Sequence, residues 1–448
     1  MTPRLQEALV RARDTRAITL GAGVLREVPA LFKAQFPGAS AQIVADPRTF
    51  RAAGADVQAA LAAVGLAGAA PLVLEAAPLI AEIRHVETLV ARLAADTAIP
   101  VAVGAGTIND LVKLAASRLG RPYLVVATAA SMDGYTAFGA SIHSEGHKQT
   151  MSCAAPRAVA ADLDVIRRAP PPLLASGYAD LMAKVVSGAD WILADALGIE
   201  AIDPAAWSLV QDGLPASLAE PEALTCGDRS ALGRLVEGLL MSGLAMQWTG
   251  TSRPASGAEH QFSHLWDMEH HVHRGAAPSH GFKVGVATRF IARLYEMLLG
   301  EPLDQLDVAA ACARWRWEPE AEATARRLFD SEALLALARR ERAAKPVTPA
   351  ALTAELNRLR TCWPELRERL RRQLLPSAEI RRRLAAVGAP DRPSAIGLSR
   401  ERMVASAWRA QQIRRRYTVL DLCLRAGLLE RFLDRYHDGD EDECCRTP

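Results

Sequence analysis

The chain has 448 residues, of which 50% are hydrophobic and 5% aromatic, and its formal net charge is +2. This length exceeds what one hydrophobic core usually supports, so we expect two domains. The near-neutral charge argues against general attraction to acidic polymers, and no apolar run reaches the roughly 18 residues that a membrane-spanning helix needs. The charged start, MTPRLQEALVRARDTR, lacks the apolar segment of a secretion signal, so a cytoplasmic location is expected.

The cysteines and arginines argue against two further classes. Seven cysteines occur without CxxC spacing, so we expect reduced thiols and no zinc site built from cysteines. The segment after Phe329 holds 24 Lys and Arg against 17 Asp and Glu, but its arginines alternate with Leu, Ala and compensating glutamates. This pattern favours a solvated helix face over a nucleic-acid-binding surface.

The first third alternates short apolar runs with amphipathic segments. Strands are predicted at residues 17–20, 41–44, 72–74, 101–103, 123–127 and 157–163, with helices at 25–36, 49–64 and 81–96 and a hairpin at 141–151. Strands separated by helices indicate a Rossmann-like parallel sheet covered on both faces. Such sheets bind ligands at the carboxyl ends of their strands.

Residues 99–137 carry the first candidate site. The turn Gly104-Ala105-Gly106 follows a strand and precedes a helix expected to begin at Thr107. Glycine lets the backbone approach a ligand, and the N–H groups of a helix start attract anions, so a phosphate-bearing cofactor would fit here. A purely structural glycine turn is the alternative.

Asp46 follows the second strand, where an acidic side chain commonly accepts hydrogen bonds from an adenosine ribose. The alternative is a helix N-cap for the segment after Pro47. An acid here favours NAD over NADP, whereas Arg48 and Arg51 could hold a 2′-phosphate, so both cofactors stay open.

After the triplet Pro170-Pro171-Pro172 almost every segment has a helical pattern. The triplet therefore marks the expected boundary between an α/β nucleotide-binding domain, residues 1–168, and an all-helical metal- and substrate-binding domain, residues 169–448. An apolar helical domain is also compatible with a homodimer.

Three polar side chains in the helical half supply a nitrogen- and oxygen-rich set for a divalent ion, namely Asp180, His260 and His280. His264 lies one helical turn after His260. Each residue also has an ordinary alternative, since Asp180 could pair only with Lys184 and a histidine pair at this spacing often lies on a surface. His270, His271 and His273 form a rival set, in a polar loop expected to be exposed.

Six blocks of sequence resemble the glycerol-1-phosphate dehydrogenase family, especially its longer bacterial AraM-type members. They are GAGTINDLVK, TAASMDGYTA, GYADLMAKVVSGADW, SRPASGAEHQFSHLWDME, SHGFKVGVAT and RRRYTVLDL, in this order between about residues 99 and 423. The family belongs to the superfamily shared by dehydroquinate synthase and iron-containing alcohol dehydrogenases. The resemblance implies the dehydroquinate synthase-like fold.

The resemblance also implies roles for single residues. The implied cofactor contacts are Gly104, Gly106, Thr107, Ile108, Asn109 and Asp110 at the pyrophosphate, Thr128 and Ser131 at the nicotinamide side, and Asp46 at the ribose. The implied substrate contacts are Asp133, Asp180 and His264, and the implied metal ligands are Asp180, His260 and His280. Asp180, His260, His264 and His280 together form the implied catalytic set.

The chain departs from the family pattern at two positions. The usual triple glycine is Gly-Ala-Gly here, so Ala105 places a methyl group near the phosphates. A serine often found at the end of the TAASMDG block is Ala137, which leaves Thr136 as the nearby hydroxyl. Both positions concern how the cofactor is held.

The function that the resemblance implies is metal-dependent, reversible hydride transfer from NAD(P)H to dihydroxyacetone phosphate, giving sn-glycerol 1-phosphate for phospholipid metabolism. Zinc, nickel and iron all suit the ligand set. Lys184, Lys283 and Arg415 are candidates for the substrate phosphate. The alternatives are a dehydrogenase of an unphosphorylated polyol, a cyclising lyase of the dehydroquinate synthase type, and a binding protein without activity.

Overall fold

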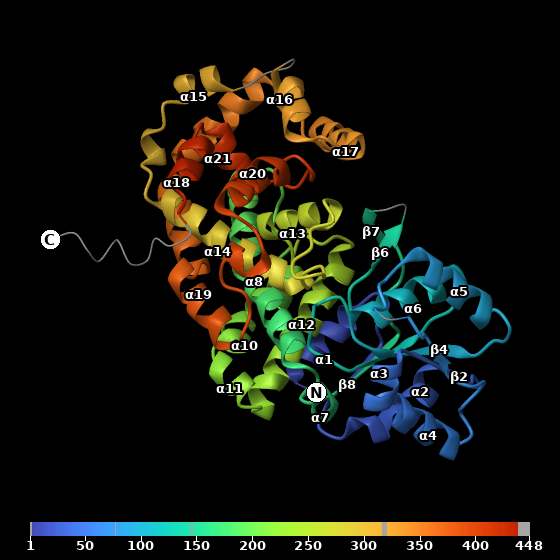
Figure 1. Ribbon diagram of the computed structural model, residues 1–448. Coiled ribbons are helices and arrows are strands. Elements are labelled where there is room, and N and C mark those ends of the chain that lie inside the picture. The colour runs from blue at the N-terminus through green and yellow to red at the C-terminus, as the bar shows by residue number, and fades with distance from the viewer. Residues whose placement is uncertain (1, 77, 145–146, 316–319, 438–448) are drawn as a thin grey trace. The chain divides into compact units, whose positions relative to one another are not determined.

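The computed structural model describes residues 2–76, 78–144, 147–315 and 320–437 (Figure 1). The chain forms two compact units: unit 1 holds residues 1–181, 204–255 and 386–388, and unit 2 holds 182–203, 256–385 and 389–448. Unit 1 therefore includes helices beyond the sheet region, and the division into domains after residue 168 stays a prediction. Within the described ranges, no helix is long and apolar enough to cross a membrane.

The sheet of unit 1 is fully parallel, with strand order β1-β8-β5-β4-β2-β3. Its strands are β1 (Ala17–Gly21), β2 (Ala41–Ala45), β3 (Leu72–Val73), β4 (Ile99–Gly104), β5 (Leu124–Ala127) and β8 (Ala158–Asp162). A separate antiparallel pair joins β6 (Ala140–Ser144) to β7 (His147–Met151). All the predicted strands and the hairpin are confirmed.

Burial explains why these short runs form strands. Every residue of β2, β4, β5 and β8 is buried, as expected where helices cover both faces of a parallel sheet. On one face, Ile43, Val101 and Val126 pack with Phe32 and Leu61 in a single apolar cluster. The predominantly apolar sequence of these strands therefore reflects their buried position.

The helices of unit 1 connect the strands and continue after the sheet. They are α1 (Pro3–Arg11), η1 (Val24–Glu27), α2 (Val28–Gln35), α3 (Pro47–Thr49), η2 (Phe50–Gly54), α4 (Ala55–Ala63), α5 (Ile83–Leu93), α6 (Gly106–Arg118), α7 (Leu163–Ile166), α9 (Pro204–Gln211), α10 (Leu214–Leu218), α11 (Pro221–Thr225) and α12 (Arg229–Thr249). The long helix α8 (Pro171–Ala196) starts in unit 1 and continues into unit 2 after Leu181.

Unit 2 is helical throughout its described part. Its elements are α13 (Ala258–Met268), α14 (His280–Leu299), η3 (Leu303–Gln305), α15 (Val308–Arg314), α16 (Glu320–Leu328), α17 (Glu332–Ala343), α18 (Pro349–Gln373), α19 (Ser377–Ala386), η4 (Pro393–Ile396), α20 (Arg400–Ala410), α21 (Val419–Arg425) and α22 (Leu429–Arg435). The helix-rich second half that the sequence predicts is therefore confirmed.

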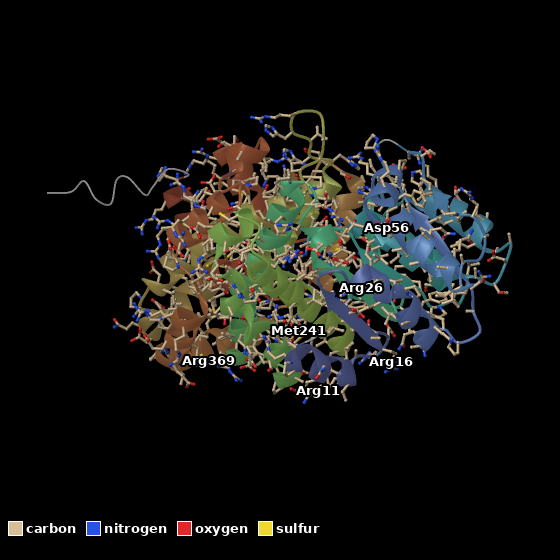
Figure 2. The ribbon with its side chains drawn as sticks, turned by 90° about the horizontal axis from the view of Figure 1, so that it is seen from below. Arg11, Arg16, Arg26, Asp56, Met241 and Arg369 are labelled. Atoms are coloured by element: carbon tan, nitrogen blue, oxygen red, sulfur yellow. The ribbon has the colours of Figure 1, made fainter. Side chains whose placement is uncertain are left out.

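Arginines of the second half lie on helix faces next to carboxylates. Arg369 of α18, labelled in Figure 2, has its Nη2 3.2 Å from Oδ2 of Asp195. Arg382 and Arg383 both pair with Glu379 on their own helix. This compensation agrees with the predicted solvated faces.

The described cysteines are free thiols, namely Cys153, Cys226, Cys312, Cys362 and Cys423. Cys153 and Cys423 are buried, and Cys226 is exposed. The remaining pair, Cys444 and Cys445, lies outside the described residues.

The loop that joins β5 to β6, residues 128–139, is packed tightly against helices of unit 1. A Cβ atom added at Gly177 of α8 would lie 1.9 Å from the carbonyl oxygen of Ala130, and one at Gly243 of α12 would lie 2.1 Å from Oγ1 of Thr136. Only glycine permits helix backbones to approach a loop this closely. The loop therefore has a fixed position within unit 1.

We expect Gly177→Ala to destabilise unit 1, because the added methyl group overlaps the Ala130 carbonyl. Overpacking of this kind costs about 1–3 kcal/mol. The matched control is Gly233→Ala on α12, whose Cβ would make an ordinary 3.6 Å contact with Leu163. This control should be neutral or should stabilise by about 0.5–1 kcal/mol, because alanine favours helix. Urea denaturation followed by circular dichroism measures both, and equal midpoints for the two variants would contradict the packing argument.

Candidate metal centre and cofactor loop

The turn after β4 leads directly into α6. A Cβ atom at Gly104 would lie 2.5 Å from Cβ of Ile108, and one at Gly106 would lie 3.0 Å from Cε of Met132. Ala105 is the N-cap of α6, with φ −89° and ψ −163°, an extended conformation that any residue adopts. The Gly-Ala-Gly sequence is therefore compatible with this turn, because glycine is sterically required only at its two outer positions.

The start of α6 can bind an anion. Gly106, Thr107 and Ile108 form its first turn, where backbone N–H groups have no partner within the helix. These groups and the helix dipole favour a phosphate at this end. The backbone fits the pyrophosphate of a dinucleotide, and the contacts assigned to these residues stay predictions.

Asn109 and Asp110, two of the predicted cofactor contacts, bind the protein itself. Nδ2 of Asn109 donates to the Gly134 carbonyl at 3.3 Å, and its Oδ1 accepts a hydrogen bond from the Tyr123 hydroxyl at 3.0 Å. Oδ2 of Asp110 accepts from the backbone N–H of Ser141 at 3.2 Å. These side chains hold the segment after β5 in place beside the helix start.

Lys113 is the strongest of these attachments. Its ammonium group donates to the carbonyls of Gly134, Ala137 and Gly139 at 2.9, 2.8 and 3.1 Å. The side chain is 1% exposed, and burial lowers its pKa, partly offset by the charge of Asp110. Lys113 was not among the site residues predicted from sequence, although a lysine on the otherwise apolar stretch LVKLAA of this helix was a usable signal.

Asp46 caps a helix, as the alternative interpretation predicted. Its Oδ1 accepts from the backbone N–H groups of Arg48 and Thr49 at 2.7 and 3.0 Å, and the backbone N–H of Asp46 donates to Oγ1 of Thr49 at 3.1 Å. The second carboxylate oxygen, Oδ2, has no hydrogen bond to a residue in the described ranges. The cap therefore leaves one oxygen for a ribose hydroxyl, a role that stays a prediction.

Asp133 and Asp180 are joined within unit 1. The backbone N–H of Asp133 donates to Oδ2 of Asp180 at 3.0 Å, and the hydroxyl of Ser242 donates to Oδ2 of Asp133 at 2.8 Å. Both carboxylates are at most 8% exposed. The substrate contact and the metal ligand predicted from sequence are thus neighbours on a fixed backbone.

The hydroxyl residues of the same loop are buried. Thr128 and Ser131 are 6% and 8% exposed, and Ser176 of α8 donates to the Ser131 carbonyl at 3.2 Å. Thr136 donates to the carbonyl of Leu240 at 2.7 Å, so its hydroxyl serves packing between the loop and α12. Thr136 therefore does not substitute for the serine missing at Ala137.

Three histidines gather in unit 2. The ring centroids of His260 and His280 lie 5.2 Å apart, and that of His264 lies 6.4 Å from each. Nδ1 of His260 is 2.6 Å from Oε1 of Glu259, and Nδ1 of His280 is 3.3 Å from the Ser263 hydroxyl. Because Nδ1 is engaged in His260 and in His280, Nε2 is the atom of each of these two rings that would ligate a metal.

Asp180, His260 and His280 form a candidate metal centre. One ligand atom of each residue lies within 4.8 Å of the other two, and among the described residues these three form the one His, Cys, Asp or Glu group with such spacing. Asp180 and His260 are buried and His280 is partly buried. Two imidazoles and one carboxylate suit zinc, nickel or iron and leave coordination positions open, so the donor set fits a catalytic divalent ion.

A second layer of carboxylates supports His260. Oε1 of Glu259 also accepts from the backbone N–H of Gly257 at 2.7 Å, whereas its buried Oε2 has no hydrogen-bond partner among the described residues. Asp190 binds the N–H of Ala258, the hydroxyl of Tyr295 and the N–H of Val419. Burial and then the charge of Glu259 raise the pKa of Asp190 to about 7. Glu259 and Asp190 were not among the residues predicted from sequence.

The rival histidines are not part of this group. His270 is exposed, His271 has its Nε2 2.7 Å from the Ile396 carbonyl oxygen, and His273 forms a backbone bridge with Ala276.

Three cations were predicted as candidates for binding the substrate phosphate. Lys283 forms an ion pair with Asp267, Lys184 is fully buried and Arg415 is exposed. Their roles toward substrate stay predictions.

Comparison with known proteins agrees with this geometry. The model of the iron-containing alcohol dehydrogenase family matches residues 19–170. The glycerol-1-phosphate dehydrogenase (NAD(P)+) of Halalkalibacterium halodurans is 38% identical over 256 residues, which is 57% of this chain and 64% of that protein. The enzyme of the same name from Pyrococcus horikoshii is 32% identical over 298 residues, covering 66% of this chain and 83% of that protein. The match thus spans just under two thirds of the first relative.

Solved structures agree on the fold. The crystal structure of glycerol dehydrogenase from Schizosaccharomyces pombe superimposes with a TM-score of 0.60 and 16% identity, covering 97% of this chain and 92% of that one. At this identity the likeness concerns the fold alone. It confirms the predicted combination of a Rossmann-like α/β region with an all-helical region.

We expect Lys113→Met to loosen the loop, because three backbone carbonyls would lose a charged donor. An unsatisfied buried polar group costs roughly 1–3 kcal/mol. Amide hydrogen exchange followed by mass spectrometry should show faster exchange in residues 134–139. Lys33→Met, at an exposed position of α2, is the control and should leave these rates unchanged. Equal protection in the two variants would contradict an anchoring role.

We expect Glu259→Ala to weaken metal binding by about 10–100-fold, the usual effect of removing a carboxylate that orients a ligating histidine. Glu259→Gln should retain more of the affinity, because its amide oxygen can still accept from Nδ1 of His260. Competition with a chromogenic zinc chelator measures both dissociation constants. Identical constants for wild type and Glu259→Ala would show that Glu259 does not orient this histidine.

Proposed function

We propose, from the premise that this chain belongs to the glycerol-1-phosphate dehydrogenase family, that it reduces dihydroxyacetone phosphate to sn-glycerol 1-phosphate. In the reduction NAD(P)H gives a hydride to the carbonyl carbon and one proton goes to the carbonyl oxygen, and the reaction is reversible. The observation that carries the proposal is the close grouping of Asp180, His260 and His280.

In this proposal Asp180, His260 and His280 hold one divalent ion, which is zinc, nickel or iron. When bound, the ion supplies Lewis acidity to the substrate oxygen that becomes an alkoxide. Glu259 fixes the His260 ring through Nδ1, so that Nε2 points to the ion. The burial of Asp180 and His260 keeps water away and strengthens the electrostatic effect of the site.

His264 orients the substrate or relays the proton, because its ring lies 6.4 Å from the rings of both proposed histidine ligands. Asp133 contacts the substrate, since the hydrogen bond from its N–H to Asp180 places it beside the proposed ligand set.

The nucleotide would bind along the loops that end the central strands. The pyrophosphate lies at the start of α6, on the segment from Gly104 to Asp110, and the nicotinamide lies near Thr128 and Ser131. Asp46 offers Oδ2 to the ribose, while Arg48 and Arg51 are exposed beside it and can accept a 2′-phosphate. The proposal therefore includes both NAD and NADP.

We include three further assignments in the proposal. Residues 1–168 serve the nucleotide, and residues 169–448 serve the metal and the substrate. The chain assembles as a homodimer, and it works in the cytoplasm. These assignments rest on the sequence pattern and on the family.

A chiral assay of the product tests the proposal. Dihydroxyacetone phosphate and dihydroxyacetone are each incubated with NADH or NADPH, with zinc, nickel, iron or no added metal. We expect sn-glycerol 1-phosphate from the phosphorylated ketone only, with one cofactor oxidised per product. A preference for dihydroxyacetone would contradict the substrate, and turnover without net cofactor oxidation would indicate cyclising chemistry instead.

The variant His260→Ala provides the control for that assay. Loss of one of three ligands should abolish stoichiometric metal binding and reduce turnover by more than a hundredfold, while circular dichroism stays unchanged. Full turnover by metal-depleted His260→Ala protein would contradict the proposed centre.

A further inference from the structure

Unit 2 contains a cavity of about 690 Å³ that shares no residue with the candidate metal centre or the cofactor loop. Its walls come from α15, α16 and α17 on the one hand and from α20, α21 and α22 on the other, together with the connection after α17. Figure 1 draws these helices in gold and red. A volume in the range of about 300–1,000 Å³ is typical of sites for small organic ligands.

The lining of the cavity is basic. It contains Arg314, Arg339, Arg342, Lys345 and Arg425, against one acidic side chain, Glu430. Arg339 and Arg342 share a single carboxylate, that of Glu322, at 2.5 and 2.9 Å. The carboxylate of Glu322 thus holds both guanidinium groups on this wall.

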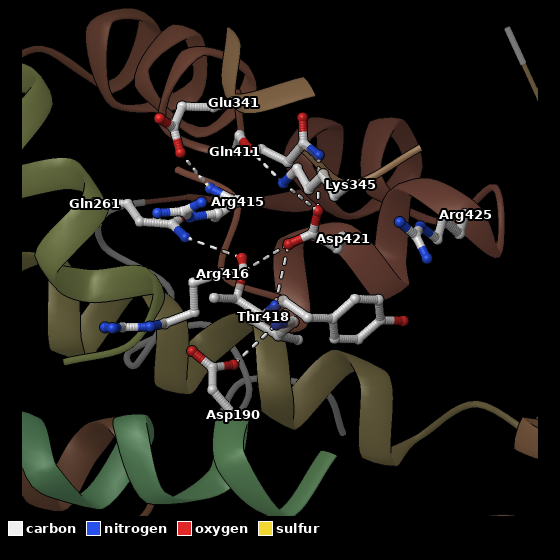
Figure 3. Close-up of polar contacts among 12 residues, drawn as sticks. Asp190, Gln261, Glu341, Lys345, Gln411, Arg415, Arg416, Thr418, Asp421 and Arg425 are labelled. Carbon is white, nitrogen blue, oxygen red and sulfur yellow. Dashed lines mark hydrogen bonds and ion pairs between the residues drawn. The ribbon is translucent and has the colours of Figure 1, made fainter. Parts of the chain in front are cut away.

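Two other cations of the lining are neutralised and fixed. Lys345 donates to Oδ1 of Asp421 at 2.6 Å and to the Gln411 carbonyl at 3.0 Å, and Gln411 itself donates to Asp421, as Figure 3 shows. Arg425 pairs with Glu355. These bonds hold both cations against the protein.

Arg314 is the cation available to a ligand. It is exposed at the end of α15, and it forms no hydrogen bond or ion pair with any residue in the described ranges. Oε1 of Gln412, in the same lining, is buried and has no hydrogen-bond partner among the described residues. A polar ligand in this cavity could satisfy this acceptor and also pair with the guanidinium group of Arg314.

Aromatic and aliphatic side chains complete the wall. Trp315 and Trp408 are both partly exposed and line the cavity, and Leu424, Leu429 and Val347 add apolar surface. Indole rings stack on planar rings, and guanidinium groups bind anionic head groups. We propose that this cavity is a second, non-catalytic binding site for an aromatic organic anion, whose head group lies at Arg314 and whose ring packs against the tryptophans.

The proposal is tested with 8-anilinonaphthalene-1-sulfonate, an aromatic anion that becomes fluorescent when it leaves water. The metal-loaded full chain is titrated with this probe while tryptophan fluorescence is excited. We expect one site per chain, with energy transfer from the tryptophans to the probe. Saturating NADH should not displace the probe, because none of the residues proposed to contact the dinucleotide lines the cavity.

Three variants locate the probe. Arg314→Glu reverses the available charge, Trp408→Ala removes a stacking ring, and Ala321→Trp fills the cavity from α16 without changing its charge. Each should raise the dissociation constant of the probe at least tenfold, with unchanged circular dichroism and metal content. Arg372→Glu, on an exposed face of α18, is the charge-matched control and should bind as the wild type does.

Two results would overturn the proposal. The first is equal binding by wild type, Arg314→Glu and Ala321→Trp, because the probe would then lie elsewhere. The second is displacement of the probe by NADH, which would place it in the nucleotide site. Both results are independent of whether the chain acts on dihydroxyacetone phosphate.

Discussion

The hydrogen bond from the backbone N–H of Asp133 to Oδ2 of Asp180 ties the loop after β5 to the candidate metal centre. Asp133 belongs to the loop after β5, and Asp180 is the carboxylate of the candidate metal centre. This charge-assisted hydrogen bond favours one orientation of the Asp180 carboxylate and couples it to the position of the loop. Gly177, one turn before Asp180, lets α8 approach the loop closely enough for this bond.

Buried charged side chains also fix the segments around the hydrogen bond between Asp133 and Asp180. The ammonium group of Lys113 gathers three loop carbonyls, and the carboxylate of Glu259 holds the ring of His260. Burying an ion is costly unless several hydrogen bonds compensate it, so such groups specify one geometry. The protein thus uses its buried ions to fix backbone and ligand positions around the place where chemistry is proposed.

Much of the fold could be predicted from the sequence because its signals are local. The strands around Val101 and Val126 are continuous apolar runs, and the turn at Gly104 separates strand from helix. The predicted pairing of β6 with β7 is also a local pattern. The order β1-β8-β5-β4-β2-β3 is not local, because it depends on which strands pack beside one another after the helices have crossed the sheet.

By itself, the sequence determined the residue types of the site, namely Asp180, His260 and His280 with a glycine turn, and the family to which they point. Only the tertiary structure decided which atoms meet, because residues far apart in the chain are brought within ångströms by packing rather than by spacing. It gave Asp46 a capping bond that the sequence left as an alternative, and it gave Lys113 an anchoring role that the sequence did not suggest. The pattern of apolar and polar side chains along the chain specifies its helices and strands. The candidate site is specified by the hydrogen bonds that buried polar groups must make.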